Sequence, residues 1–528
     1  MKFHSLARTD AFVAALVAFS SLALYTRTLA PGLLLGDSGE FQTLVYTLGM
    51  THPTGYPVFV LLGRLFTLLP IGELAWRANL FVAILAALTL ACVYLSLRLL
   101  VGWRLAALAG TFALAVNPLF WFYAVVAELY IPACAFIAAI VLLLLLWRQS
   151  ENPRFLFTAG LLGGLSLGVH STVALIAPGI GIWLLVNGQF RKSWKPAVFG
   201  ALLGLLLAFS SFLFLDFYSA PSTYYDATVR HALSAWTMTP ADFDSPFERL
   251  EFLYTGRQFS QLMFRNPIEV MQNNGGGYLE ILQNGFAPLT LALIGLGLPA
   301  VFVSCWREGL LFLLAGGAQT LFALNYEVDD FYVFFIPSFV FLALWAGIGL
   351  GKLLDGIGWG ARRLLKGQKP AFAASALLGA IVLGLSIQPW SEMLLTAWRD
   401  ERVTFAIGTP LDEYPYPIED PAWVHDEAEV LVNALEPDAI LFTGWDVLYP
   451  YYFVAHVEQG KTGLAFHETY PQDGMNGLAE STADYIAASL PRPVYFAERP
   501  TGANATRFTF KPVIKDGIRL YQVTGVKP

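Results

Sequence analysis

Charged side chains are scarce in this chain: Asp, Glu, Lys and Arg make up 13% of its 528 residues, while hydrophobic residues make up 56%. That is too little polar surface for a water-soluble protein of this length, so a soluble globular enzyme is excluded as the whole molecule. Cysteine is rarer still. Cys92, Cys134 and Cys305 all lie in or at the end of apolar runs, which excludes a disulfide framework or a thiolate metal site. The net charge of −7 argues against a nucleic-acid partner.

Long uncharged runs are what the chain has instead, and its mean hydropathy is +0.57. Each crossing of a bilayer by a helix needs about 20 apolar residues. The sequence therefore predicts a polytopic α-helical membrane protein, surrounded by membrane lipids, with eleven candidate spans at 11–29, 78–100, 105–120, 131–147, 155–172, 173–188, 196–215, 286–305, 308–325, 332–351 and 371–389.

Basic residues predict the orientation of these spans, because short cytoplasmic connections collect Lys and Arg. Starting from Lys2 and Arg8, every second connection is basic, at 98–104, 148–154, 191–195, 307 and 352–369. Acidic residues dominate the opposite connections. The alternation predicts a cytoplasmic N-terminus and, with an odd number of spans, a C-terminal tail outside the cytoplasm.

Two regions are predicted from this layout: a transmembrane part over residues 1–390 and an extracytoplasmic α/β domain over 391–528. The first outer loop covers about 30–77, and its short apolar segment Tyr56 to Leu69 contains Arg64, which favours an interfacial helix over a crossing. A long outer loop covers about 216–285. In the C-terminal region, strands are expected at Ala439–Phe442, Val494–Ala497 and Ile518–Val523, with a helix at Asp426–Leu435.

The densest polar cluster follows the first span, in the string GDSGEFQ at 36–42 and the string THPTGYP at 51–57. Asp37 and Glu40 are three residues apart, so they share one face of a helix that begins there. One interpretation is a helix cap and a solvated loop. The other is a catalytic base, Asp37, with Glu40 orienting the acceptor or raising the pKa of one carboxyl by like-charge proximity. His52 fits either a bond to substrate or a packed histidine.

Further candidates lie in the other outer segments, each with a structural alternative. Glu128 is expected either to bind a sugar or a divalent ion or to be a solvated surface residue. His170 is expected either to bind substrate or to pack at a helix junction. Arginines of the long loop match phosphate oxygens, because a guanidinium presents a fork of donors. They are Arg230, Arg257 and Arg265. Three consecutive glycines within Asn273 to Tyr278 predict a flexible lid or a plain loop.

The string from Pro31 to Pro70 resembles the signature of a bacterial membrane family related to the eukaryotic transmembrane-protein-260-type O-mannosyltransferases. Supporting matches are Asn117 to Trp121, Ala127 to Tyr130 and Gly164 to His170. Such proteins are similar to the GT-C superfamily, so the resemblance implies a GT-C-like fold in a bacterial inner membrane. It covers about the first 180 residues.

The resemblance also implies a reaction. GT-C proteins take a sugar from a polyprenyl-phosphate carrier on the non-cytoplasmic face, with a catalytic carboxylate in the first outer loop, where Asp37 lies. The expected activity is inverting transfer to an acceptor hydroxyl on a glycan or a protein, with protein O-mannosylation as one form. Asp37 and Glu40 are the expected catalytic residues. Substrate binding is expected at His52, Tyr56, Glu128, His170, Arg230 and Arg257. A divalent metal is one candidate cofactor.

Three other functions are compatible with parts of the sequence. A lipid-linked glycan ligase would use the same loop chemistry with a larger donor. A transporter would place ionisable groups near the bilayer midplane, yet 131–147 and 372–388 carry none. A non-catalytic assembly protein would use the outer domain to recruit a partner, and it would tolerate the loss of Asp37.

Overall fold

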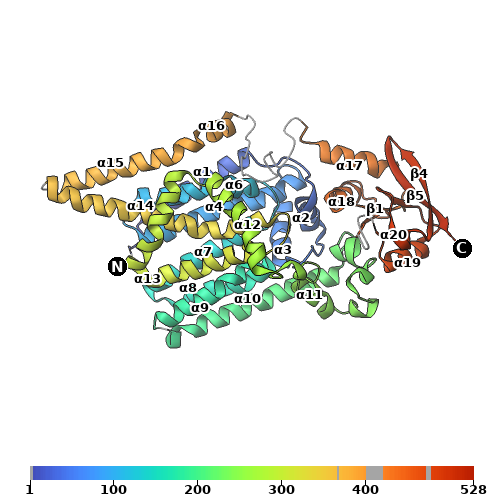
Figure 1. The fold of residues 1–528 in the computed structure, drawn as a ribbon, viewed down its shortest axis with the longest axis horizontal. Helices are drawn as coiled ribbons and strands as arrows, with labels where there is room; N and C mark the ends of the chain where they lie inside the picture. Colours follow the sequence, from blue (N-terminus) through green and yellow to red (C-terminus); the bar gives the residue numbers. More distant parts are fainter. Residues whose placement is uncertain (1–3, 189, 366–367, 400–419, 471–476, 528) are drawn as a thin grey trace. The chain divides into compact units, whose positions relative to one another are not determined.

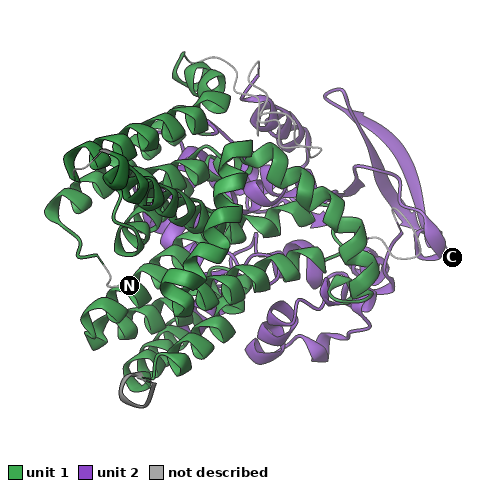
Figure 2. Cartoon of the chain, turned by 60° about the vertical axis from the view of Figure 1, so that its left-hand side comes forward, with its two compact units in different colours: residues 1–29, 82–208, 261–415 green, residues 30–81, 209–260, 416–528 purple. Residues whose placement is uncertain are grey.

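The computed structural model describes residues 4–188, 190–365, 368–399, 420–470 and 477–527. These residues form two compact units, each built from three stretches of the chain (Figure 2). Unit 1 comprises residues 1–29, 82–208 and 261–415, and unit 2 comprises residues 30–81, 209–260 and 416–528. The first outer loop, part of the long outer loop and most of the C-terminal region therefore belong to one unit. The predicted division at residue 390 stays a prediction.

Unit 1 is helical, as Figure 1 shows. Its helices are α1 (Arg8–Arg27), α5 (Arg104–Ala115), α6 (Pro118–Ala124), α7 (Tyr130–Ser150), α8 (Pro153–Leu165), α9 (Ala177–Val186), α12 (Pro267–Gly285), α13 (Pro288–Leu324), α14 (Ile336–Leu365), α15 (Gln368–Ile387) and α16 (Ser391–Arg399). Two long helices, α4 (Leu74–Leu100) and α10 (Phe190–Tyr218), run from one unit into the other.

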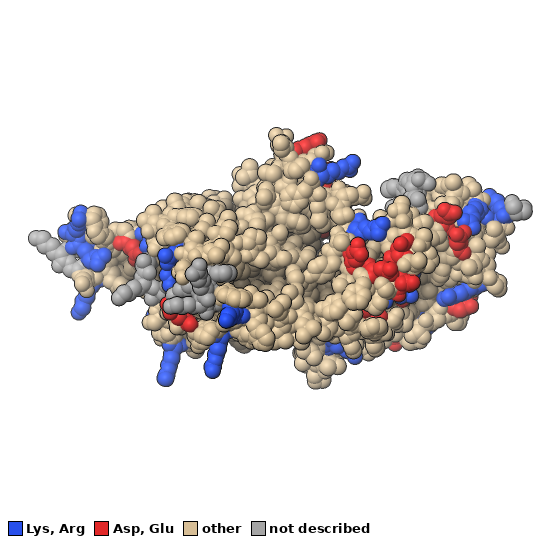
Figure 3. Space-filling model, turned by 90° about the horizontal axis from the view of Figure 1, so that it is seen from below, with Lys and Arg blue, Asp and Glu red and all other residues tan. Residues whose placement is uncertain are grey.

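Seven helices among the described residues are long and apolar enough to cross a membrane: Arg8–Arg27, Leu74–Leu100, Tyr130–Ser150, Trp194–Tyr218, Pro288–Leu324, Phe331–Leu364 and Gln368–Arg399. The pair α5 and α6, bent by 67°, makes eight if it counts as one span. The chain is thus a multi-pass membrane protein, and Figure 3 shows a broad area of its surface without charged side chains.

The predicted number of eleven spans stays a prediction, because length and composition alone give the seven or eight candidates above. Two of the predicted spans, 286–305 and 308–325, correspond to two helical arms that meet at a break at Cys305 and together make up α13. Two others, 155–172 and 173–188, are interrupted, because α8 has 13 residues and gives way to 3-10 turns at Ser166–Gly168 and Ser171–Ile176. Hydropathy records apolar length, and it does not record where the backbone bends or changes helix type.

The glycine run that predicted a lid or loop at Asn273 to Tyr278 lies inside the helix α12 instead. Asn274 donates from its side chain to the Tyr326 carbonyl at 3.2 Å, and a side chain at Gly277 would collide with the Phe331 ring. Gly277 thus allows close packing, whereas side chains at Gly275 and Gly276 would meet open space.

Unit 2 begins with α2 (Gly36–Thr47) and α3 (Pro57–Thr67), so the short apolar segment is a helix, as predicted. Arg64 is accommodated on α3 because its guanidinium donates to the Tyr46 carbonyl at 2.8 Å and covers the Tyr46 ring. The other helices of unit 2 are α11 (Pro246–Tyr254), α17 (Trp423–Ala434), α18 (Trp445–Tyr452), α19 (Glu480–Ser489) and α20 (Gly502–Ala505).

The C-terminal region is an α/β structure, as predicted, around a sheet with the strand order β2-β1-β3-β5-β4. Its strands are β1 (Ile440–Thr443), β2 (Ala465–Glu468), β3 (Val494–Phe496), β4 (Phe508–Lys515) and β5 (Ile518–Val526). The strands β2, β1 and β3 are parallel, while β5 is antiparallel to β3 and β4.

Both faces of the sheet are covered, because side chains alternate along each strand. Leu441 belongs to a core with α17 and α18, whereas Ile440 and Phe442 belong to a second core with α19. Since β1 and β2 are parallel, their carboxyl ends lie at the same edge of the sheet. Chain segments that bear function commonly follow such an edge.

Two buried histidines join the long loop to the sheet within unit 2. His231 Nε2 lies 3.0 Å from the Glu468 carbonyl, and His467 Nδ1 lies 2.9 Å from the Asp226 carbonyl. Their rings are 4.7 Å apart. Burial lowers the pKa of His231 to about 4, and it lowers the pKa of His467 well below its ordinary value. Both rings are therefore neutral in the folded protein at pH 7.

The two histidines predict that unit 2 loses stability in mild acid. Between pH 6.5 and about 4 the unfolded chain binds protons that the folded chain excludes, so the free energy of unfolding falls as the pH falls through this window. His231 alone accounts for a loss of roughly 3 kcal/mol. Thermal unfolding in detergent at several pH values measures it. His231→Gln should flatten the pH dependence, whereas the same change at the half-buried His425 should not, and equal slopes in both variants would contradict the prediction.

Candidate functional site

Asp37, Glu40 and His52, which the sequence singles out, come together in unit 2 at the start of α2. A hydrogen-bond network sets the position of this helix. Leu34 N–H donates to Gln42 Oε1 at 2.9 Å, and the Gln42 amide donates to the Gly32 carbonyl and to Asn79. All these atoms belong to the first outer loop or to the start of α4. The loop thereby fixes the first turn of α2, which carries Asp37. The free backbone N–H groups of this first turn favour a negative charge on the Asp37 side chain.

Glu40 is fully buried, and His52 satisfies its carboxylate. Oε1 accepts a hydrogen bond from the His52 backbone N–H at 2.8 Å, and Oε2 lies 2.5 Å from the ring Nδ1. Burial raises the pKa of the Glu40 carboxyl, and the positive potential of His52 partly offsets that rise. Glu40 therefore fixes both the backbone and the ring of His52.

The other edge of the His52 ring is directed toward Asp37: Nε2 lies 3.9 Å from Asp37 Oδ2. Asp37 Oδ1 accepts a hydrogen bond of 2.7 Å from the indole N–H of Trp445, at the start of α18. The Asp37 side chain keeps 37% of its surface accessible, while the Glu40 side chain has none. Of the two carboxylates, Asp37 is the one that a ligand reaches.

Aromatic rings surround His52. Phe41, Tyr56, Tyr224 and Trp445 all have ring centroids within 6.5 Å of the imidazole. Tyr56 itself is held by its hydroxyl, which donates to the Pro53 carbonyl at 2.6 Å. Tyr224 is joined to the first outer loop through its backbone N–H, which donates to the Met50 carbonyl at 2.8 Å. The site thus combines ionisable groups with a largely apolar wall, as ligand sites commonly do.

Three segments far apart in the sequence supply this site. The first outer loop gives Asp37, Glu40, His52 and Tyr56, the long loop gives Tyr224, and the C-terminal region gives Trp445. Aromatic side chains are clustered near the start of α18 in the C-terminal region, where they can form a core or contact a sugar or polypeptide. The structure divides them: Tyr449 and Tyr452 are buried in the core, and Trp445 reaches Asp37.

The two long-loop arginines have local partners in unit 2. Arg230 forms an ion pair of 3.1 Å with Asp226, and Arg257 donates to the Trp236 carbonyl at 3.3 Å. Their predicted role as phosphate clamps stays a prediction. Arg265 belongs to unit 1.

The remaining predicted site residues, Glu128 and His170, lie in unit 1. Glu128 is buried between α6 and α7. The Nδ1 atom of His170 accepts from the Thr172 N–H at 3.3 Å, so this histidine caps a 3-10 helix. Binding of substrate by either residue stays a prediction.

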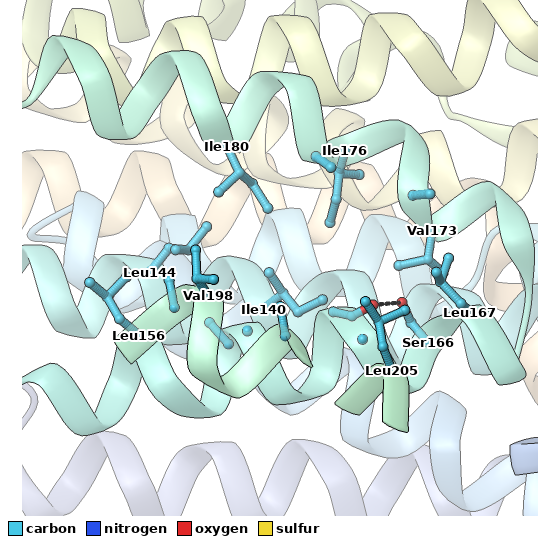
Figure 4. A pocket seen from close by; sticks show the side chains of 18 of the residues that line it. Ile140, Leu144, Leu156, Ser166, Leu167, Val173, Ile176, Ile180, Val198 and Leu205 are labelled. Carbon is cyan, nitrogen blue, oxygen red and sulfur yellow. Dashed lines mark hydrogen bonds between the residues drawn. The ribbon is translucent and has the colours of Figure 1, made fainter. Parts of the chain in front are cut away.

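An apolar cavity of about 330 Å³ also lies in unit 1 (Figure 4). Its lining comes from α7, α8, α9, α10 and the turns between α8 and α9, and includes Ile140, Leu144, Ile180 and Leu205. The lining residue with a polar side chain is Ser166, whose hydroxyl donates to the Gly163 carbonyl at 2.7 Å. This lining suits hydrocarbon and supplies no acid or base.

A metal site was another expectation. Among the residues that the structure describes, no group of three or more His, Cys, Asp or Glu side chains is arranged to hold a metal ion. A divalent metal stays a prediction.

Comparison with solved structures identifies the fold. The chain has the same fold as ArnT from Cupriavidus metallidurans bound to undecaprenyl phosphate, with a TM-score of 0.53, 14% identity and 98% of both chains covered. It also matches the oligosaccharyltransferase of Archaeoglobus fulgidus in the apo form, with a TM-score of 0.51, 14% identity, and 95% of this chain and 73% of that chain covered. The predicted GT-C-like fold is therefore confirmed.

Sequence comparison identifies the family that the chain resembles. Residues 37–194 match the N-terminal domain of protein O-mannosyl-transferase TMEM260. The mouse protein of that name is 30% identical over 223 residues, which cover 41% of this chain and 31% of the relative. The Dictyostelium discoideum protein is 25% identical over 305 residues, covering 53% and 35%. The resemblance is confirmed, and the chain spans about a third of the length of these curated relatives.

Close packing of α2 on α18 brings Trp445 to Asp37. It predicts that the stability of the fold is sensitive to a larger side chain at position 39. A side chain at Gly39 would lie 2.4 Å from the Leu34 carbonyl oxygen and 3.1 Å from Pro450 Cδ. Gly39→Ala should therefore destabilise the fold by about 1–3 kcal/mol through overpacking. Thermal unfolding measures the effect. The matched control is Gly444→Ala just before α18, where a side chain meets open space, and equal stability of the two variants would contradict the packing described.

Proposed function

We propose that the chain is a membrane glycosyltransferase that moves a sugar from a polyprenyl-phosphate carrier to an acceptor hydroxyl, with Asp37 as the base. The observation that carries the proposal is the accessible Asp37 carboxylate, held by Trp445 and backed by the His52–Glu40 pair. The GT-C-like fold and the O-mannosyl-transferase relatives support it.

The reaction requires little covalent chemistry from the protein, because a sugar on a lipid phosphate already has a good leaving group. Asp37 takes the proton of the acceptor hydroxyl while that oxygen attacks the anomeric carbon. The bond between the anomeric carbon and the phosphate oxygen breaks, and the phosphate leaves with the electron pair. A single displacement of this kind inverts the anomeric configuration.

Glu40 and His52 act as positioning residues in this proposal. Because Glu40 is buried and bonded to His52 through two atoms, the imidazole cannot turn away from Asp37 without leaving a buried carboxylate unpaired, which is costly. Trp445 fixes the opposite side of Asp37. The carboxylate is thus preorganised for proton transfer, so its side chain does not have to reorient during the reaction.

The donor class and the location follow from the same sources. ArnT was solved with undecaprenyl phosphate, so we propose a polyprenyl-phosphate donor, and the relatives favour mannose as the sugar and protein as the acceptor. We also propose that the chain lies in a bacterial inner membrane with a cytoplasmic N-terminus and that residues 391–528 face the outside. The site would then act outside the cytoplasm.

The proposal predicts that Asp37→Asn abolishes transfer. The asparagine amide cannot take the proton from the hydroxyl of the acceptor substrate. We therefore expect the transfer rate to fall about 100-fold or more, in the range typical of general-base removal. The measurement is label transfer from a panel of radiolabelled polyprenyl-phosphate sugars to membrane extract, by purified protein in nanodiscs.

The control is Asp484→Asn, which removes an exposed carboxylate of unit 2 that pairs with Arg507. It should transfer label as the wild type does, and both variants should unfold at the wild-type temperature. Equal transfer by Asp37→Asn and wild type would remove Asp37 from the chemistry. Absence of transfer from every donor by the wild type would favour a glycan ligase, which uses a larger donor.

A further inference from the structure

A third carboxylate belongs to the same part of unit 2, and nothing in the sequence singled it out. Glu468 ends β2, at the carboxyl edge of the parallel strands β1 and β2. Trp445 follows β1 at that same edge and bonds to Asp37. The adjacent strand ends thus supply one residue that holds the base and one further acidic group.

Electrostatic interactions place Glu468 near the Asp37 site. Burial raises the pKa of the Glu468 carboxyl to about 7, and the charges of Glu40 and Asp37 raise it as well. Burial also raises the pKa of Tyr224, with contributions from Glu468, Glu40 and Asp37. Tyr224 packs against both His52 and Trp445, with ring centroids 6.5 and 5.9 Å away. The Tyr224 ring therefore borders the Asp37 site, and the Glu468 charge acts on its hydroxyl.

Two buried polar atoms in this place have no hydrogen-bond partner among the described residues. One is Glu468 Oε2, and the other is the hydroxyl oxygen of Thr228, which interacts with the Glu468 carboxyl closely enough to offset part of the rise in its pKa without completing a well-formed hydrogen bond. Thr228 is fully buried. An unsatisfied buried acceptor costs stability, so a pair of such atoms beside a candidate site calls for a partner.

A substrate hydroxyl has the chemistry that satisfies both atoms. It donates to one acceptor and accepts from one donor, and Glu468 Oε2 and the Thr228 hydroxyl provide that combination. The aromatic ring of Tyr470 adds an apolar wall beside Glu468, and it packs against the Trp236 ring at a tilt of 43° with centroids 4.6 Å apart. A sugar presents hydroxyls at its rim and an apolar face, which matches this lining.

We infer that Glu468 and Thr228 bind a hydroxyl group of the substrate and set which substrate the site accepts. The inference rests on the proposed function. The hydroxyl comes from the donor sugar or from the acceptor, and in either case it donates to Glu468 and accepts from Thr228. Glu468 is a binding residue in this scheme, while Asp37 remains the base.

The experiment is equilibrium binding to the full chain in nanodiscs. The two probes are radiolabelled polyprenyl-phosphate mannose and a peptide that carries serine and threonine. Glu468→Gln should weaken the binding of one of them about tenfold, since a hydrogen bond to a charged group is lost. Thr228→Val keeps the side-chain shape and should weaken the same probe a few-fold. Weaker binding of the lipid assigns the hydroxyl to the donor, and weaker binding of the peptide assigns it to the acceptor.

The matched control is Glu436→Gln, in the same unit, where the carboxylate pairs with Lys515 at 2.6 Å instead of lying near Asp37. It should bind both probes as the wild type does. Wild-type affinity of Glu468→Gln for both probes, with wild-type unfolding temperature, would overturn the inference. Transfer assays on the same samples separate the two proposals: binding without transfer by the wild type overturns the proposed function alone, and binding of neither probe overturns both.

Discussion

The bond between Glu40 and His52 is the constraint on which the rest of the site depends. A carboxylate buried inside a protein is costly unless donors surround it, and His52 supplies both its backbone N–H and its ring nitrogen. The first turn of α2 and the loop before α3 are thereby fixed to each other. Because Nδ1 is committed to Glu40, the opposite ring nitrogen is directed toward Asp37.

Unit 2 shows how the chain completes this site from distant segments. The first outer loop alone supplies the acid–base groups, but one oxygen of Asp37 is held by Trp445 of the C-terminal region, and the aromatic wall includes Tyr224 of the long loop. The glycine at position 39 permits the approach of α18 that this requires. The C-terminal α/β part is therefore a component of the site within unit 2, and its buried histidines join it to the long loop.

Much of this could be predicted from the sequence, for identifiable reasons. Apolar length gave the membrane helices, the spacing of Asp37 and Glu40 gave the polar face of α2, and Arg64 marked α3 as too polar for a crossing. The break at Cys305 coincides with the predicted boundary between the spans 286–305 and 308–325, whereas the 3-10 turns after α8 could not be predicted, because hydropathy does not encode changes of helix type. The bond between Trp445 and Asp37 and the placement of Glu468 at the same sheet edge could not be predicted, because both depend on how β1 and β2 pair, which no local pattern of residues specifies.

The most direct test of the central claim is an experimental structure of the chain with an unreactive analogue of a polyprenyl-phosphate sugar. If transfer takes place at Asp37, the anomeric carbon of the analogue will lie beside the Asp37 carboxylate, with Trp445 still bonded to Oδ1 and His52 to Glu40. A sugar bound at Glu128 and His170 instead, with Asp37 in contact with no part of the ligand, would contradict the account.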